Sequence, residues 1–141
     1  MKKREPVSTI MTKNAFTVQL EDSLYEVRDL IHNHEIRHVP VMHQGKLVGI
    51  VSRTDMNRLS FSNLFAGEEH ADEAIFEMLN ISQVMSQKPR VVRATDTIHD
   101  IAAIFATEEF HALPVVDEND DTTLVGIVTT TDVIRYLLDQ Y

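Results

Sequence analysis

The sequence repeats itself: its second half matches its first after a shift of 74 residues. Val18 then falls on Val92 and Pro40 falls on Pro114. The shift becomes 77 after the polar stretch 117–121, and residues 47–51 match residues 124–128 without exception. A short insertion is tolerated best in such a turn-like stretch. The chain therefore consists of two copies of one unit, and its fold must be built from both.

Both copies predict the same order of elements. Asp-Ser and Asp-Thr pairs precede apolar residues at helical spacing, so a helix should begin at Leu24 and at Ile98. Alternating and continuous apolar runs predict two strands joined by a short turn, the first turn carrying Gly45. The full expectation is a short strand at 16–18 and 90–92, a helix, a hairpin at 38–51 and 112–128, and a final helix starting at Asp55 and Asp132.

A repeat of about 55 residues is too small to bury its apolar face comfortably. We therefore expect an α+β fold in which two β-α-β-β-α repeats pack sheet to sheet with pseudo-twofold symmetry. The predicted boundaries are 1–59 for the first repeat, 60–80 for a helical linker and 81–141 for the second repeat. The linker combines apolar residues at helical spacing with an acidic face, which either is solvated or contacts a partner. The apolar residues are Ala71, Ala74, Ile75, Met78 and Leu79, and the acidic residues are Glu68, Glu69, Asp72, Glu73 and Glu77.

Composition excludes several classes of protein. The chain has no cysteine, which excludes disulfides, thiolate metal sites and a cysteine nucleophile. Its four glycines do not form a dinucleotide-binding, P-loop or nucleophile-elbow motif. A net charge of −9 is unfavourable for nucleic-acid binding. Because no apolar run is long enough for a membrane span or a signal peptide, we expect a soluble cytoplasmic protein.

Two motifs recur in register and identify a family. The segments Ile36-Arg37-His38-Val39-Pro40-Val41 and Phe110-His111-Ala112-Leu113-Pro114-Val115 are each followed by a turn and a Gly-x-x-[Ser/Thr]-x-x-Asp pattern, at 49–55 and 126–132. The openings at 7–12 and 81–86 also match each other. This arrangement resembles the tandem CBS domain pair, or Bateman module, over nearly all of residues 7–138.

The resemblance implies a regulatory module that binds an adenosine-containing ligand, such as AMP, ADP, ATP or S-adenosylmethionine, in clefts between the paired repeats. Magnesium would accompany ATP, and no other cofactor is implied. By analogy with the family, Asp55 and Asp132 accept hydrogen bonds from ribose hydroxyls. The remaining implied ligand contacts are phosphate or ribose at Ser52, Thr54, Thr129 and Thr131, phosphate at Arg37, His38 and His111, and adenine at Ile50, Ile127, Val18 and Val92.

These ligand-binding roles are chemically reasonable, but helix capping and surface exposure could also explain several of the same residues. A carboxylate can accept from two adjacent hydroxyls, and a helix start favours an anion. However, Asp55 and Asp132 at strand-to-helix junctions would also serve as helix N-caps. Arg37 and His38 could form an ordinary exposed rim, whereas Pro40 and Pro114 are best explained as strand punctuation. Since Ala112 takes the place of a second basic residue, the sequence predicts one better phosphate site and not two equal ones.

His34-Glu35-Ile36-Arg37-His38 also spells the H-E-x-x-H pattern of zinc proteases. That chemistry requires both histidines on one helical face. Pro40 disfavours a helix at the preceding residue, and the repeat places His38 at the start of a strand. We therefore expect no metal site and no enzyme activity.

The function predicted from the sequence is ligand sensing without chemistry, with no effector domain fused to the pair. The output would then pass through an unidentified effector protein or through self-association. Val133, Ile134, Leu137 and Leu138 on the last helix are expected to supply apolar surface for a homodimer. The alternative is an interaction scaffold of the same fold that has lost its ligand.

Overall fold

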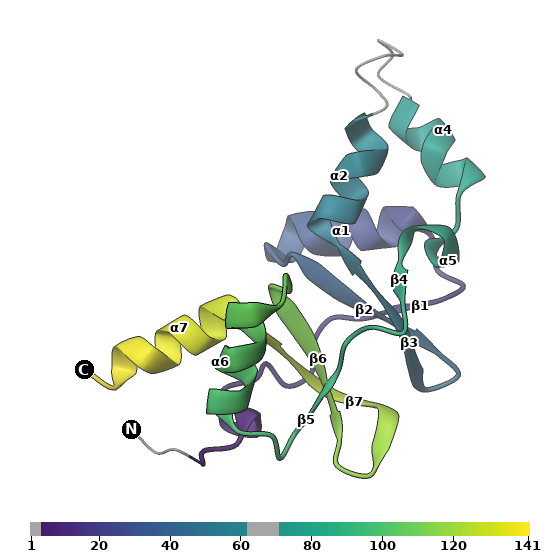
Figure 1. The fold of residues 1–141 in the computed structure, drawn as a ribbon. Helices are drawn as coiled ribbons and strands as arrows, with labels where there is room; N and C mark the ends of the chain where they lie inside the picture. The colour runs from purple at the N-terminus through teal and green to yellow at the C-terminus, as the bar shows by residue number, and fades with distance from the viewer. Residues whose placement is uncertain (1–3, 62–70) are drawn as a thin grey trace. The chain divides into compact units, whose positions relative to one another are not determined.

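The computed structural model describes residues 4–61 and 71–141, which form two compact units (Figure 1). The central unit comprises Phe16–Lys88. The terminal unit combines the N-terminal segment up to Ala15 with Pro89–Tyr141. Each unit is described by itself below.

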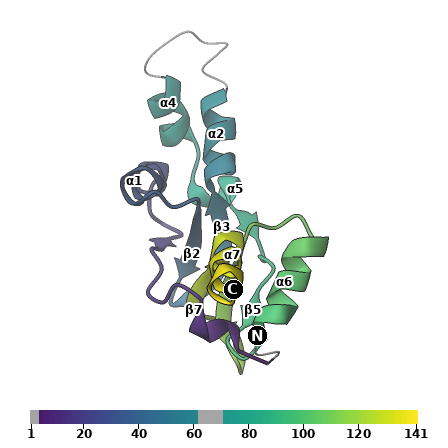
Figure 2. The same cartoon turned by 90° about the vertical axis from the view of Figure 1, so that its left-hand side faces the viewer.

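The central unit contains one sheet and four described α-helices. Its elements are β1 (Val18–Gln19), α1 (Leu24–His34), β2 (His38–His43), β3 (Lys46–Ser52), α2 (Arg53–Phe61), α4 (Ala71–Met78), α5 (Ile81–Val84) and β4 (Ser86–Gln87). Helix α4 lies alongside α2 (Figure 2). A helix is thus present at 71–78 within the predicted linker, but Met78 of the predicted apolar face is 80% exposed and Phe76 is buried instead. Glu68 and Glu69 lie outside the described residues.

The central sheet has the strand order β1-β2-β3-β4. Strand β1 runs parallel to β2, and β2 forms an antiparallel hairpin with β3. Gln44 and Gly45 form the two-residue turn with φ values of 51° and 77°. Two consecutive positive φ values match the twist of a tight hairpin, which explains the glycine in the predicted turn.

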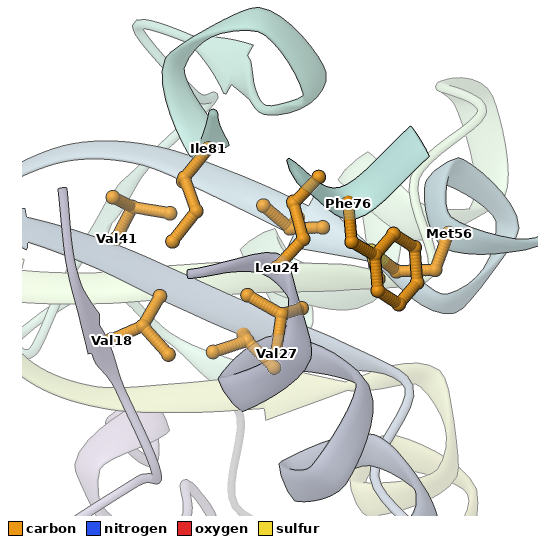
Figure 3. Packing of buried hydrophobic residues seen from close by; sticks show 9 residues of the cluster. Val18, Leu24, Val27, Val41, Met56, Phe76 and Ile81 are labelled. Carbon is orange, nitrogen blue, oxygen red and sulfur yellow. The ribbon is translucent and has the colours of Figure 1, made fainter. Parts of the chain in front are cut away.

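The core of the central unit is aliphatic and packs between the sheet and its helices (Figure 3). Leu24 and Val27 on α1 are fully buried against strand residues, while Met56 on α2 contacts the same cluster. The complete buried set is Val18, Leu24, Val27, Val39, Val41, Val51, Met56, Phe76 and Ile81. The helical and alternating spacings of the sequence thus converge on one cluster.

The terminal unit repeats this plan. Its elements are the 3₁₀ helix η1 (Val7–Thr9), β5 (Val92–Arg93), α6 (Ile98–Thr107), β6 (Ala112–Asp117), β7 (Asp120–Thr129) and α7 (Thr130–Asp139). The sheet order is β5-β6-β7, with Val92 paired to Val115 where the central unit pairs Val18 to Val41. Its core is Val7, Val92, Ile101, Leu113, Val115, Val128 and Val133.

The opening segment of each repeat packs in the unit formed by the other repeat. In the terminal unit, Thr12 bridges Ile127 through backbone hydrogen bonds of 2.8 and 3.0 Å. In the central unit, Ser86 pairs with Ile50, the equivalent position. The compact units therefore cross the boundaries of the sequence repeats.

Glycine is required where these opening segments meet the hairpins. A Cβ on Gly126 would lie 2.7 Å from Met11 Sδ and 2.8 Å from the carbonyl oxygen of Thr12. A Cβ on Gly49 would similarly collide with Met85 Sδ and approach the Ser86 oxygen to 3.0 Å. Gly49 and Gly126 thus permit close approach of another backbone segment.

Three expectations need correction. The final helices begin at Arg53 and Thr130, two residues before Asp55 and Asp132, because the preceding hydroxyl residue takes the capping position. The short strands start at Val18 and Val92, where they form parallel pairs with β2 and β6. Val133 is 6% exposed and belongs to the core, so it supplies no surface on α7.

The other three residues predicted to form the apolar surface of α7 are exposed. Ile134, Leu137 and Leu138 are 56%, 38% and 65% exposed. They follow the buried Val133 at positions that turn away from the core. No helix in the described ranges is long and apolar enough to cross a membrane.

A hydrogen bond links the ends of the chain within the terminal unit and predicts an alkaline effect. The Tyr136 hydroxyl donates to Glu5 Oε2 at 2.7 Å, which raises the Tyr136 pKa above its ordinary value of 10.0, with desolvation as the lesser cause. The hydrogen bond stabilises the folded state fully below the pKa of tyrosine in the unfolded chain. This stabilisation is lost as the pH rises through the higher pKa of Tyr136 in the folded state. Wild type should therefore exceed Tyr136→Phe in urea stability at neutral pH, and the difference should shrink above about pH 10. A difference independent of pH would contradict this assignment.

Candidate functional site

The first candidate site lies where β3 ends and α2 begins. The Ser52 backbone N–H donates to Asp55 Oδ2 at 2.8 Å, and the Asp55 N–H donates to Ser52 Oγ at 3.0 Å. This reciprocal pair is a capping box, which satisfies backbone donors at the helix start. The turn therefore holds the hydroxyl and the carboxylate in a defined arrangement.

The second repeat builds the same junction between β7 and α7. The Thr129 N–H donates to Asp132 Oδ2 at 2.9 Å, and the Asp132 N–H donates to Thr129 Oγ1 at 3.1 Å. The prediction that Asp132 is the N-cap is wrong, because Thr129 is the N-cap and Asp132 is the third helical residue. The same geometry corrects the capping prediction for Asp55.

Each capping box leaves one carboxylate oxygen uncommitted to the cap. Asp55 Oδ1 lies 3.7 Å from an Arg58 guanidinium nitrogen. Asp132 Oδ1 has no hydrogen bond or ion pair to any residue in the described ranges. Both aspartates are half-buried. Asp132 is therefore the better-placed acceptor for a hydroxyl group of a ligand. Its Oδ2 serves the cap and its Oδ1 stays available, so the two roles do not compete.

The predicted basic residues lie beside these junctions. The Arg37 carbonyl accepts from the Arg53 N–H at 2.7 Å, and His38 pairs with Ser52 across the hairpin. In the second repeat, the His111 carbonyl accepts from the Thr130 N–H at 3.0 Å. The fold thus brings each basic position to its own capping box. Arg37 and His111 have exposed side chains, whereas His38 is half-buried.

The other predicted ligand residues divide between surface and core. Thr54 and Thr131 occupy the second helical position and are exposed. Val18, Val92 and Ile127 are only 2%, 3% and 8% exposed, since they pack in their own units. Ile50 is half-buried and presents more surface than these three. Of the predicted adenine contacts, Ile50 has the most side chain available.

The H-E-x-x-H pattern does not form a zinc-protease helix. Helix α1 ends at His34, and Glu35 follows in the left-handed conformation with φ 53°. His38 begins β2, so the two histidines lie on different elements. Within residues 4–61 and 71–141, no group of three or more His, Asp or Glu side chains is arranged to hold a metal ion.

One basic surface was not predicted. A groove between α1 and α2 is lined by Arg28, Arg37 and Arg53, and only Arg37 had been singled out from the motif. The signal was present in the repeat, because Arg28 and Arg53 fall on Ala102 and Thr130. Because the second copy has uncharged residues at these positions, the shared fold does not require a positive charge there.

Two repeated hairpins, each closed by a hydroxyl–aspartate capping box, define a tandem domain pair. The family model for the CBS domain matches residues 7–61 and 81–139. The chain belongs to the CBS domain family, and its two matched segments are the two copies of the repeat.

Solved structures with this fold cover nearly the whole chain. The crystal structure of CBSX2 in complex with AMP has a TM-score of 0.78 and 28% sequence identity, and the match covers 96% of this chain and 98% of that one. A second structure of CBSX2, from Arabidopsis thaliana, has a TM-score of 0.80. The expected fold of two CBS repeats is therefore confirmed.

Curated relatives differ in length. MJ1225 of Methanocaldococcus jannaschii is 29% identical over 134 residues, which are 94% of this chain and 47% of that protein. A CBS domain-containing protein of Dictyostelium discoideum is 26% identical and is covered over 90% of its length. The chain spans only 23% of a matching inosine-5'-monophosphate dehydrogenase from Korarchaeum cryptofilum. Relatives thus include proteins more than twice as long as the matched pair.

Proposed function

We propose that the chain is a regulatory module that binds an adenosine-containing ligand at its strand-to-helix junctions without transforming it. The observation that carries the proposal is the likeness to CBSX2, whose structure is a complex with AMP and aligns with 96% of this chain at 28% sequence identity. AMP is therefore the first ligand to test, ahead of ADP, ATP with magnesium, and S-adenosylmethionine.

The two capping boxes support this proposal chemically. In each, Ser52 or Thr129 holds an aspartate by backbone and side-chain hydrogen bonds, which fixes the carboxylate before any ligand arrives. A fixed acceptor loses little conformational entropy on binding. The uncommitted Oδ1 of Asp132 would accept from ribose, with Thr131 and His111 nearest the phosphate. Asp55, Thr54, Arg37 and His38 would form the corresponding half-site of the first repeat.

Thermal unfolding of nucleotide-stripped protein tests the proposal. Saturation with AMP at ten times its dissociation constant should add about 1.4 kcal/mol to the free energy of unfolding, because ligand bound to the folded state stabilises it. Asp132→Ala should reduce this gain more than Asp55→Ala, since Asp55 already has Arg58 as a neighbour. Asp139→Ala, which removes an exposed carboxylate from the same helix, is the control.

The result also separates the proposal from its alternative. If none of the four ligands changes the unfolding temperature of folded, ligand-free protein, the sensor proposal fails. The interaction scaffold then becomes the better account, and the search moves to its protein partner.

The exposed face of α7 supports a proposal about output. We propose that Ile134, Leu137 and Leu138 pair with the same residues of a second copy, because burying them removes apolar surface from water. A cytoplasmic homodimer that passes ligand occupancy to an effector protein is the form we expect. Sedimentation equilibrium showing a monomer at all accessible concentrations would contradict the dimer.

A further inference from the structure

The opening strap, residues 5–12, completes the terminal unit but is not continuous with the rest of that unit along the chain. Val7 is fully buried in the terminal core, and Ile10 and Met11 pack against the same cluster. The strap therefore covers apolar surface that would otherwise face water. Along the chain it leads through residues 13–15 to Phe16, which begins the central unit. Residues 89–141 thus hold the strap by non-covalent contacts alone.

Hydrogen bonds hold the opening strap at both of its ends. Near its start, the Val7 N–H donates to the Asp96 carbonyl at 2.7 Å. At its end, Thr12 and Ile127 are joined by backbone hydrogen bonds of 2.8 and 3.0 Å. Both partners of the strap lie within 89–141. A second copy of the chain offers the same partners, so the strap of one copy fits the terminal unit of another.

The equivalent segment of the second repeat, 79–86, is connected differently. It packs in the central unit, where Ile81 is fully buried and Ser86 pairs with Ile50. Helix α4 precedes this segment within the same unit and ties it there. Among the described residues, the opening strap reaches 89–141 along the chain only by way of the central unit. The strap is therefore the one of the two segments that can leave its unit without unfolding a neighbouring helix.

Strained backbone lies where the chain passes between the two units. Asn14 and Lys88 have φ values of 53° and 47°, in the left-handed region that residues other than glycine adopt at a cost. They occupy equivalent positions of the two repeats. The boundary between the units falls within one residue of each, after Ala15 and after Lys88. A short connector under strain favours an open arrangement in which the connector extends.

We propose that the opening strap is swapped between two copies of the chain, so that residues 5–12 of each copy complete the terminal unit of the other. The swapped dimer keeps the hydrogen bonds and buried contacts of the strap and releases the strain at Asn14. Its cost is therefore mainly that of bringing two copies together. The arrangement is reciprocal and closes with two copies. It goes beyond the proposed function, requires no ligand and does not use the exposed face of α7.

Disulfide trapping tests the swap, because the chain has no cysteine of its own. Thr12 and Ile127 form a hydrogen-bonded antiparallel bridge, in which Cα atoms are about 5.5 Å apart, within the span of a disulfide. A tagged copy with Thr12→Cys is co-expressed with an untagged copy with Ile127→Cys and purified without nucleotide. After mild oxidation, a non-reducing gel should show a disulfide between the two masses. The control pairs Thr12→Cys with Asp139→Cys, an exposed position on α7.

The connector provides a second measurement. Asn14→Gly removes the left-handed strain from the closed chain, because glycine adopts positive φ at little cost. It should lower the yield of the mixed disulfide about threefold. Gln44→Gly is the matched control, since Gln44 also has a left-handed φ of 51° but lies in the turn between β2 and β3. This control should leave the yield unchanged.

Each outcome decides the proposal. A mixed disulfide above the Asp139 control, lowered by Asn14→Gly and not by Gln44→Gly, supports the swap. If one chain carrying both Thr12→Cys and Ile127→Cys closes its own disulfide and no mixed disulfide forms, the swap is overturned, and any dimer seen by sedimentation belongs to α7. Absence of both disulfides, in protein that circular dichroism shows to be folded, also overturns it. Since AMP is absent throughout, the result does not depend on the nucleotide proposal.

Discussion

Leu113→Ala is expected to lower the free energy of unfolding by about 2–5 kcal/mol, because it deletes a fully buried side chain from the terminal core. Leu113 lies on β6, which pairs with both β5 and β7. The surrounding valines belong to paired strands and cannot easily move to fill the space. The loss is a large fraction of the stability of an ordinary domain.

Leu138→Ala is the matched control for Leu113. Leu138 is a leucine of the same unit that is 65% exposed on α7, so its removal should change stability by less than about 0.5 kcal/mol in dilute monomeric protein. Urea unfolding followed by circular dichroism measures both. Equal effects of the two substitutions would show that Leu113 does not occupy the core described above.

Gly126→Ala is expected to destabilise the protein by about 1–3 kcal/mol through steric overlap. Its Cβ would lie 2.8 Å from the Thr12 carbonyl oxygen, a backbone atom that cannot rotate away. The opening segment would have to move, at the expense of the hydrogen bonds between Thr12 and Ile127. The Thr12 and Ile127 amides should therefore exchange their hydrogens faster than in wild type.

Gly49→Ala provides the comparison for Gly126. The nearest atom to its added Cβ is Met85 Sδ, on a flexible side chain that can shift, and the Ser86 oxygen is 3.0 Å away. We expect a smaller loss of stability than for Gly126→Ala. A larger loss at Gly49, or no change in exchange at Thr12, would contradict the packing of the opening segment against the terminal hairpin.

The duplication made most of the fold predictable. Residues 47–51 and 124–128 are identical, so both hairpins could be placed with the same register, and Gly45 marked the first turn. The exchange of the opening segments was not predictable, because periodicity reports which face is buried and not which distant segment covers it. Gly49 and Gly126 permit that close approach, but a glycine in a strand can have several other causes, so it does not identify the approaching segment.

The sequence predicted which residues form the strand-to-helix junctions, but it did not predict where the helices begin. The motif drew attention to Ser52, Asp55, Thr129 and Asp132, which the structure joins into two capping boxes. The helix starts were wrong because Asp, Ser and Thr are all good N-caps, and the spacing alone does not choose among them. The groove between α1 and α2 was not predicted because Arg28 lies outside the motifs and Arg53 occupies one of the unspecified positions of the 49–55 motif.

The two copies of the repeat differ in the charged groups that they offer to a ligand. The first repeat has the arginines around the groove, whereas the second has an aspartate oxygen without a described partner. Duplication would allow such specialisation, since one copy can keep a binding function while the other changes. In our account, ribose recognition is strongest at Asp132, whereas Arg37 gives the first repeat the stronger basic residue for phosphate.

The most direct test of the central claim is a map of backbone amide chemical shifts as AMP is added to nucleotide-stripped protein. The account predicts that the Thr129 and Asp132 amides shift most, with smaller changes at Ser52 and Asp55, because the ligand contacts the capping boxes. Shifts confined to other segments, or no shift at saturating AMP, would contradict binding of an adenosine ligand at these junctions.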